Sequence, residues 1–312
     1  MRIGMSLTDQ TSPGALTDLR DQLRQAAGDG FASAWISNIF GLDALTALAV
    51  AGSQVPGIEL GTAVVPTYPR HPAALAQQAL TVALAVGGRL ALGIGLSHRI
   101  VIEDMYGHSF ERPARHMSEY LSILLPLLNG EAADFAGDTM RAKIGLSVPR
   151  AGRVPVLLAA MAPAMLRLAG QRADGTVLWM TGPATVRDYV APAINSAAEA
   201  AGRPAPRVVC ILPVCVTDDT DLARARAARI FAIYGQLPSY RAMLDREGAE
   251  GPADVAITGD EETVGAQIMA LADAGVTDFV AGEFGRGEDA VRTRALLTSL
   301  IRQSADRTQP AG

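Results

Sequence analysis

His98 is the residue of this sequence whose type and position best suit chemistry. It follows the buried run Arg89–Gly95, separated from Gly95 by Leu96 and Ser97. Its imidazole is the side chain whose unperturbed pKa lies nearest neutrality. We expect His98 to donate a proton that assists hydride transfer. The alternative is that it hydrogen-bonds the backbone or a cofactor phosphate.

Three other polar groups follow or begin predicted elements. Asn38 comes directly after Ser37, at the end of a short apolar run, and is predicted either to bond the edge of a heterocycle or to cap the helix that begins at Asp43. His71 stands at a helix start, where capping or packing is the favoured role. Arg112, Arg115 and His116 begin a later helix and are predicted to lie on its surface.

Two loops of small residues suit an anionic ligand. Ala159–Pro163 and Trp179–Pro183 each join a strand to a helix, and the amide groups at a helix N-terminus attract phosphate. Thr181 and the backbone amides that follow it are predicted phosphate contacts, with a plain short turn as the alternative. The two loops together with His98 favour a cofactor that carries phosphate.

The elements that hold these residues alternate regularly. Eight apolar strands separated by helices predict an α/β fold, a closed parallel TIM-like (β/α)8 barrel, in which the loops after the strands form the active site. An open doubly wound sheet is the alternative. The predicted strands are Arg2–Leu7, Ala34–Ser37, Ile58–Val65, Arg89–Gly95, Val154–Ala160, Gly175–Trp179, Val208–Val216 and Thr277–Ala281. The predicted helices are Ala15–Ala27, Asp43–Gln54, Ala73–Val86, Arg115–Leu128, Pro163–Gln171, Ala184–Ala201, Asp219–Tyr234, Glu261–Ala274 and Glu288–Ser304.

Two segments do not fit this alternation and are predicted insertions. Residues 130–153 follow the fourth strand's helix and contain Gly137-Asp138, a predicted hairpin turn. Residues 235–258 lie near the seventh strand. The chain is therefore expected to form one barrel domain over residues 1–304, followed by a flexible tail over 305–312.

Several classes of protein are disfavoured. Gly93-x-Gly95 matches half of a dinucleotide-binding fingerprint, but His98 replaces its third glycine. The four histidines include no pair at helical spacing, so no metal site is expected. A net charge of −5 argues against nucleic-acid binding. No apolar run is long enough to cross a membrane, and no signal pattern opens the chain.

The two cysteines, Cys210 and Cys215, would point to opposite faces of one strand, so we expect no disulfide. This pattern suits a reducing cytoplasm.

Several long segments together resemble the bacterial luciferase-like superfamily, and within it the coenzyme F420-dependent oxidoreductases. The matching segments are residues 60–82, 87–98, 107–121, 167–183 and 257–280. The resemblance implies a TIM-like barrel that binds its isoalloxazine-type ring at the carboxyl ends of the strands. It also implies a homodimer.

The resemblance also assigns site residues. It implies a non-proline cis peptide bond behind the ring, and Ala63–Val64 is the matching bond. His98 and Asn38 are the candidate catalytic residues. The cofactor-binding positions are Ser37, Asn38, Ala63, Val64, Gly95, Ser97, His98, Ala160, Met161 and Thr181.

The implied activity is hydride transfer between the reduced deazaflavin F420 and a C=C, C=N or C=O bond of a small organic substrate. The alternatives are an FMN-dependent luciferase-like monooxygenase and a dimeric binding module without catalysis. Sugar-phosphate dehydrogenases of the family carry Asp-His after the second strand, and this chain has Asn38-Ile39 there. They also carry lysines for the sugar phosphate, whereas Lys143 is the only lysine here.

Two further features concern the cofactor tail and association. F420 bears a phosphodiester and an oligoglutamate tail, and arginines near the loops are expected to meet it: Arg70, Arg99, Arg150 and Arg153. The helices Asp43–Gln54 and Ala73–Val86 are rich in apolar residues beyond one inward stripe, which predicts a two-fold dimer through them. The residues concerned are Leu45, Leu48, Ala49, Leu75, Ala79 and Val82.

Overall fold

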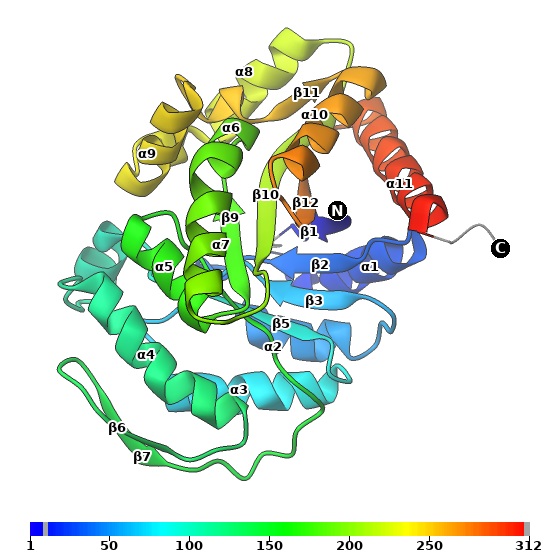
Figure 1. Ribbon diagram of the computed structural model, residues 1–312. Helices are drawn as coiled ribbons and strands as arrows, with labels where there is room; N and C mark the ends of the chain where they lie inside the picture. The colour runs from blue at the N-terminus through cyan, green and yellow to red at the C-terminus, as the bar shows by residue number, and fades with distance from the viewer. Residues whose placement is uncertain (9–11, 309–312) are drawn as a thin grey trace.

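A barrel of parallel strands lies at the centre of the computed structural model, which describes residues 1–8 and 12–308 (Figure 1). Within these residues eight strands pair side by side, and the eighth returns to the first, where Arg2 pairs with Asp278. The closed barrel is confirmed and the open sheet is excluded. In order around the barrel the strands are β1 Arg2–Ser6, β2 Ser33–Ile36, β3 Glu59–Thr62, β5 Leu90–Gly95, β8 Val156–Leu158, β9 Gly175–Trp179, β10 Arg207–Val216 and β12 Asp278–Glu283.

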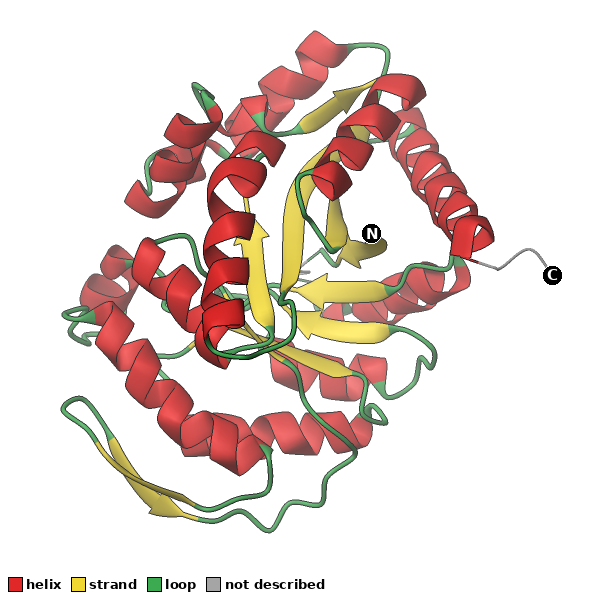
Figure 2. Cartoon of the chain, in the orientation of Figure 1, coloured by secondary structure: helices red, strands yellow, loops and turns green. Residues whose placement is uncertain are grey.

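Helices form an outer ring around the strands (Figure 2). Asp43, Asp219 and Asp260 cap helix N-termini with their carboxylates, and prolines occupy the first turn of several helices, where the missing N–H costs nothing. The α-helices are α1 Ala15–Gly28, α2 Ala44–Ala47, α3 Pro72–Ala85, α4 Pro113–Leu128, α5 Pro163–Arg172, α6 Pro183–Thr185, α7 Ala191–Ala200, α8 Thr220–Ile230, α9 Pro238–Glu247, α10 Glu261–Asp273 and α11 Glu288–Thr308. The shorter helical turns are η1 Leu48–Gly52, η2 Val101–Met105, η3 Val186–Val190, η4 Ala232–Gly235 and η5 Pro252–Asp254.

The largest local difference from expectation is in the third strand. The predicted run Ile58–Val65 is interrupted after β3, and a short strand β4, Val65–Pro66, then pairs with β5. Between the two pieces the Ala63–Val64 peptide bond is cis, as expected from the resemblance. The interruption moves these two residues out of the regular ladder at the carboxyl end of the strand.

The C-terminal helix is longer than predicted. α11 continues to Thr308, so the first four residues of the predicted tail are helical. The sequence there contains no glycine or proline before Pro310, and nothing in it ends the helix earlier. Residues 309–312 lie outside the described part of the chain.

Both insertions have structure of their own. The first contains the antiparallel hairpin β6 Ala133–Ala136 and β7 Arg141–Ile144, whose connecting loop includes the predicted turn Gly137-Asp138. The second contains α9, η5 and the strand β11, Ile257–Gly259, which pairs with the outer half of β10. The sequence does not predict β11, because three residues are too few for an alternating pattern.

The barrel interior is filled with side chains. They come from most of the strands and are Trp35, Ala91, Leu157, Val177, Val209, Ile211 and Val280. Ala63, Val64 and Trp179 pack onto this cluster and stay partly exposed. Because β9 ends at Trp179 and β3 ends just before Ala63, these three residues form the floor of the barrel mouth, at the carboxyl ends of the strands.

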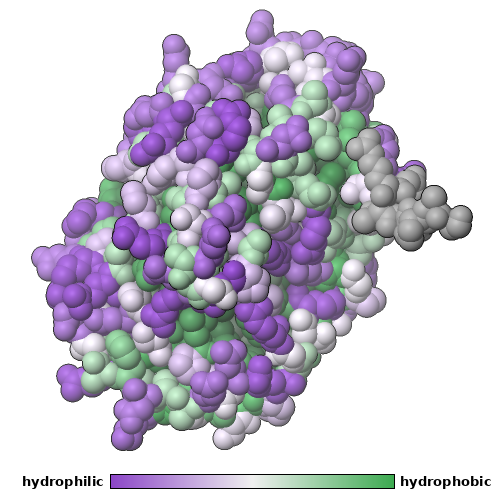
Figure 3. Space-filling model, in the orientation of Figure 1, coloured by the Kyte–Doolittle hydropathy of each residue, from purple (hydrophilic) through white to green (hydrophobic). Residues whose placement is uncertain are grey.

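A second, larger core lies between the barrel and its helices. It includes Leu45, Leu48, Leu75 and Ala79, each fully buried within one chain. The expectation that they form excess apolar surface was therefore wrong, because they pack against the barrel and against neighbouring helices. Hydrophilic side chains cover much of the outer surface, with hydrophobic ones between them (Figure 3). No helix in the described residues is long and apolar enough to cross a bilayer.

Candidate active site

The two glycines of β5 make room for the floor of the mouth. A side chain at Gly93 would place its Cβ 1.9 Å from the Thr62 carbonyl oxygen, and one at Gly95 would lie 2.6 Å from Cγ2 of Val64. β3 and the residues after it therefore approach β5 more closely than any larger residue allows. The two glycines of Gly93-x-Gly95 therefore permit close packing of two strands and do not form a dinucleotide-binding turn.

His98 stands at the edge of this floor. Ser97 has a φ of 60°, an uncommon conformation for a residue with a side chain, and it turns the chain away from β5. The His98 carbonyl then accepts the N–H groups of Val101 and Ile102, which begins the η2 segment. The His98 ring lies 5.5 Å from the ring of Tyr240, measured between centroids. Burial lowers the pKa of His98, so its imidazole is neutral at pH 7.

Of the two roles predicted for Asn38, the structure shows the helix cap. Its Oδ1 accepts the backbone N–H of Ala44 at 2.9 Å, which satisfies one of the open donors of α2. Asp43 caps the same helix through Thr46. The side-chain amide of Asn38 has no partner among the described residues, so it can still donate to a ligand in the mouth. Ser37, beside it, is partly exposed.

His116 is a functional neighbour that the sequence prediction placed wrongly on the surface. Its Nε2 lies 3.1 Å from the Thr67 hydroxyl, and its ring stacks on Tyr68 with centroids 3.9 Å apart. Burial lowers the pKa of His116 to about 4. His116 thus supports the loop after Ala63–Val64. Its spacing with Tyr120 and Leu124, four and eight residues on, marks the buried face of α4 and was the available signal.

The loop after β9 does not offer the predicted phosphate contacts. The Glu247 carboxylate, from α9, accepts the backbone N–H groups of Ala184 at 3.1 Å and Thr185 at 2.7 Å. Thr181 is fully buried, and its hydroxyl donates to the carbonyl of Trp179. In this structure Thr181 offers no accessible hydroxyl and Glu247 occupies two of the nearby amides, while the predicted contact of Thr181 with a cofactor stays a prediction.

The loop after β8 remains open to an anion. Ala162 caps α5 without a side-chain hydrogen bond, and the amide of Ala164 has no partner among the described residues. Met161 is partly exposed, and its carbonyl accepts the Tyr189 hydroxyl. Ala160 is fully buried, as is nearly all of Gly95, so any role of these two is to shape the floor and the backbone rather than to offer accessible surface.

Aromatic side chains from the end of β9, from the segment after α8 and from α9 form one wall of the mouth. Trp179 meets Phe231 and Tyr234 edge-on, at centroid distances of 5.7 and 5.6 Å. Tyr234 in turn meets Tyr240 at 5.1 Å, and Tyr240 faces His98. The wall is apolar except for the hydroxyl groups of its two tyrosines, the indole N–H of Trp179 and the imidazole of His98 beside it.

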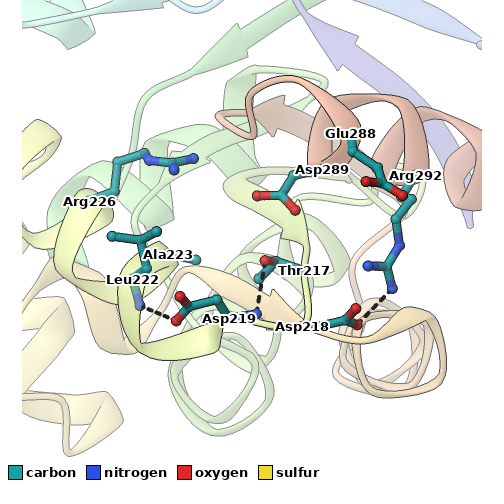
Figure 4. Close-up of a pocket in the computed structure, with 9 residues that line it drawn as sticks. All are labelled: Thr217, Asp218, Asp219, Leu222, Ala223, Arg226, Glu288, Asp289 and Arg292. Atoms are coloured by element: carbon teal, nitrogen blue, oxygen red, sulfur yellow. Dashed lines mark hydrogen bonds and ion pairs between the residues drawn. The ribbon is translucent and has the colours of Figure 1, made fainter.

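Two cavities lie beside this mouth rather than in it. One, of about 250 Å³, lies between the N-terminal ends of α8 and α11, lined by charged side chains such as Asp219, Arg226 and Asp289 (Figure 4). The other, of about 390 Å³, lies between α4 and α5. Neither contains a residue that the sequence assigned to the site.

Comparisons with known proteins agree with this geometry. The family model described as luciferase-like monooxygenase matches residues 1–278. A 5,10-methylenetetrahydromethanopterin reductase from Methanolobus tindarius is 28% identical over 286 residues, covering 82% of this chain and 87% of the relative.

Solved structures of similar fold include enzymes with two different cofactors. The coenzyme F420-dependent tetrahydromethanopterin reductase from Methanopyrus kandleri has a TM-score of 0.80 at 20% identity, covering 99% of each chain. The oxygenating constituent of 3,6-diketocamphane monooxygenase from Pseudomonas putida, in complex with FMN, has a TM-score of 0.77 at 17% identity, covering 100% of this chain and 99% of the other. Because the family model spans most of its length, this chain belongs to the luciferase-like monooxygenase family.

Proposed function

We propose that this protein is a coenzyme F420-dependent oxidoreductase acting on a small organic substrate. The coenzyme F420-dependent reductase of similar fold supports this assignment, as does an F420-dependent dehydrogenase that is 30% identical over 221 residues. The observation that carries it is the floor of the mouth, where Ala63 and Val64 pack on the barrel interior and stay partly exposed, and Gly95 leaves room for Val64. A planar tricyclic ring would pack against this surface.

The residues present fit the deazaflavin at both of its ends. The ring would rest on Ala63 and Val64, with the Asn38 side-chain amide free to donate to a ring oxygen. The phosphodiester would lie at the N-terminus of α5, where the Ala164 amide has no partner among the described residues and the helix end favours negative charge. The N-terminus of α6 is already neutralised by Glu247, which leaves α5 as the better position.

When bound, the reduced deazaflavin supplies a hydride. The protein's part is to position the substrate and to exclude water. His98, neutral at pH 7 because burial lowers its pKa, serves as a hydrogen-bonding group that orients the substrate beside the ring. As an imidazolium it would donate a proton only at pH values below the ordinary range of histidine. The aromatic wall of Trp179, Tyr234 and Tyr240 adjoins His98 through Tyr240 and shields this part of the mouth.

An FMN-dependent monooxygenase is the second candidate, because a structure of similar fold binds FMN. The open N-terminus of α5 would accept a phosphomonoester as well as a phosphodiester. The two candidates therefore differ in cofactor preference and in the need for oxygen.

We also propose a two-fold homodimer in the cytoplasm. Most of the apolar residues from which the sequence predicted a dimer are buried within one chain. The apolar side chains of this helical layer that remain exposed include Val50 on η1 and Leu84 on α3, at 44% and 39%, and these support the dimer. Both cysteines are free and buried, which agrees with a reducing compartment.

Substitution at the floor tests the proposed function. Gly95→Ala should weaken F420 binding at least tenfold, since its Cβ would displace Val64 from beneath the ring. Gly28→Ala is the matched control, because a Cβ there meets nothing within 4 Å. Binding is followed by the fluorescence of the cofactor. Equal affinities for both variants and the wild type would contradict a ring site on this floor.

A further inference from the structure

The cavity between α4 and α5 is an open groove that starts where the proposed phosphate site ends. The two helices lie side by side at the left of Figure 1. Ala164, in the first turn of α5, lines the groove and is three residues beyond Met161 at the mouth. The groove has a volume of about 390 Å³ and is lined by Ala114, Arg115, Ser118, Glu119, Ala164, Arg167, Leu168 and Gln171.

Arg167 is the unpaired charge of this groove. It is exposed, and within the described residues its guanidinium has no ion pair and no hydrogen bond. Arg115 lines the opposite wall and pairs with Asp138 at 3.1 Å, near the hairpin. The groove therefore presents two guanidinium groups, one of them free, to anything that lies between the helices.

The one carboxylate that lines the groove is engaged elsewhere. Glu119 accepts hydrogen bonds from the backbone N–H groups of Asp138, Thr139 and Met140 and from the Thr139 hydroxyl. Burial would raise the pKa of Glu119, but these hydrogen bonds hold it at about 2. Its oxygens face the hairpin, so its charge is largely balanced there and in part by Arg115 at 3.7 Å.

The groove is also a stable part of the surface. Nη1 of Arg172 donates to the Ser118 carbonyl at 2.9 Å and to the Ser122 hydroxyl at 3.1 Å, which ties α5 to α4 along the groove. The shape that a ligand would meet is thus held by these partly buried hydrogen bonds rather than by the exposed arginines themselves.

The arginines that the sequence assigned to the cofactor tail are all engaged with other groups. Arg70 pairs with Asp43, and Arg99 pairs with Glu103 at 2.7 Å. Arg150 donates to the carbonyl of Asn129, and Arg153 pairs with Asp174. Arg167 was not among the predicted residues, and it is free.

We infer that the α4–α5 groove binds the acidic tail of the deazaflavin, with Arg167 as its main contact. The inference rests on the proposed function and adds a binding surface to it. A phosphodiester at the N-terminus of α5 would direct the chain of carboxylates along the outer side of α5, between Arg167 and Arg115. Exposed carboxylate–guanidinium contacts of this kind are weak singly and add up along a flexible anionic chain.

The test compares two forms of the cofactor on purified protein: one with a long oligoglutamate tail and one that ends at the phosphodiester. Dissociation constants are measured by fluorescence titration at low and high salt. Arg167→Glu should weaken binding of the long-tailed form about tenfold, or about 1.4 kcal/mol, through lost attraction and new repulsion. The tail-free form should bind the variant and the wild type alike. Arg229→Glu, an exposed reversal on α8, is the matched control.

A second measurement does not depend on any variant. The wild type should bind the long-tailed form more tightly than the tail-free form at low salt, and high salt should remove that difference. The inference would be overturned if Arg167→Glu weakened binding of both forms equally or of neither. It would also be overturned if the wild type bound both forms with the same affinity at low salt. A wild type that binds neither form would instead contradict the proposed function, so the two failures are distinguishable.

Discussion

At the scale of single residues, the candidate site depends on two glycines as much as on its polar side chains. Gly93 and Gly95 allow the chain after β3 to approach β5, and this places Ala63 and Val64 on the floor of the mouth. His98 lies in the loop after β5, and its burial favours a neutral ring over the proton donor first expected. Asn38 caps α2 with its side-chain oxygen, and its side-chain nitrogen has no partner among the described residues.

Substitution of His98 separates its two roles. If the neutral ring orients the substrate, His98→Ala should slow single turnover about tenfold, the loss of one hydrogen bond, and His98→Gln should restore part of the rate. The rate should not rise as the pH falls from about 8 toward neutrality, because burial lowers the pKa of His98 and keeps the ring mainly neutral there. His108→Ala, an exposed change on the same segment, is the control.

A general-acid role would give a different result. The wild-type rate would rise as pH falls through a value below 6.5, since only the protonated ring donates, and His98→Ala would abolish that rise with a loss of about 10²–10⁴-fold.

At the scale of elements, regular apolar periodicity predicted the helices and strands, whereas local interruptions of an element gave no signal in the sequence. The nine predicted helices and eight strands follow from apolar patterns and from caps such as Asp43 and Asp260, and the structure contains all of them with shifted ends. β11 and the interruption at Ala63–Val64 leave no periodic signal, because each concerns three residues or fewer. The contact of Glu247 with the N-terminus of α6 joins residues about sixty positions apart, which no local pattern reports.

Glu247 offers a test at this scale. Glu247→Gln removes the negative charge at the N-terminus of α6, and should lower the free energy of unfolding by about 1 kcal/mol. Because the same carboxylate docks α9, hydrogen exchange of the amides in Pro238–Glu247 should become faster. Glu250→Gln, an exposed neighbour, should change neither quantity. Unaltered exchange in Glu247→Gln would mean that α9 is held by other contacts.

At the scale of the whole molecule, an ion network closes the barrel at the end opposite the mouth. Arg207 of β10 contacts Glu59 of β3 and Asp278 of β12, each at 2.8 Å, and Arg2 of β1 reaches the same two carboxylates. Burial lowers the pKa of Arg207, but hydrogen bonds to Asp278 and Glu59 outweigh that effect and raise it overall. The network joins the first and last strands of the barrel.

Removing this arginine should destabilise the whole barrel. Arg207→Gln leaves the buried carboxylate of Asp278 with Arg2 as its one ion-pair partner in the described residues and the Thr277 hydroxyl as a donor, and should reduce the free energy of unfolding by about 3 kcal/mol in urea titrations. Arg24→Gln, which breaks an exposed pair with Asp21, should cost less than about 1 kcal/mol. We also expect one cooperative transition, as for a single domain. A comparable effect of the two substitutions would contradict a structural role for the network.

The cofactor itself gives the most direct test of the proposed function. The purified protein is titrated with F420 and, separately, with FMN, and both dissociation constants are measured by fluorescence under the same salt. On the proposed placement, the N-terminus of α5 would accept either phosphate, and Arg167 beside it would favour the acidic tail. We predict at least a tenfold preference for F420, about 1.4 kcal/mol. Equal affinities, or a preference for FMN, would contradict the assignment as an F420-dependent oxidoreductase.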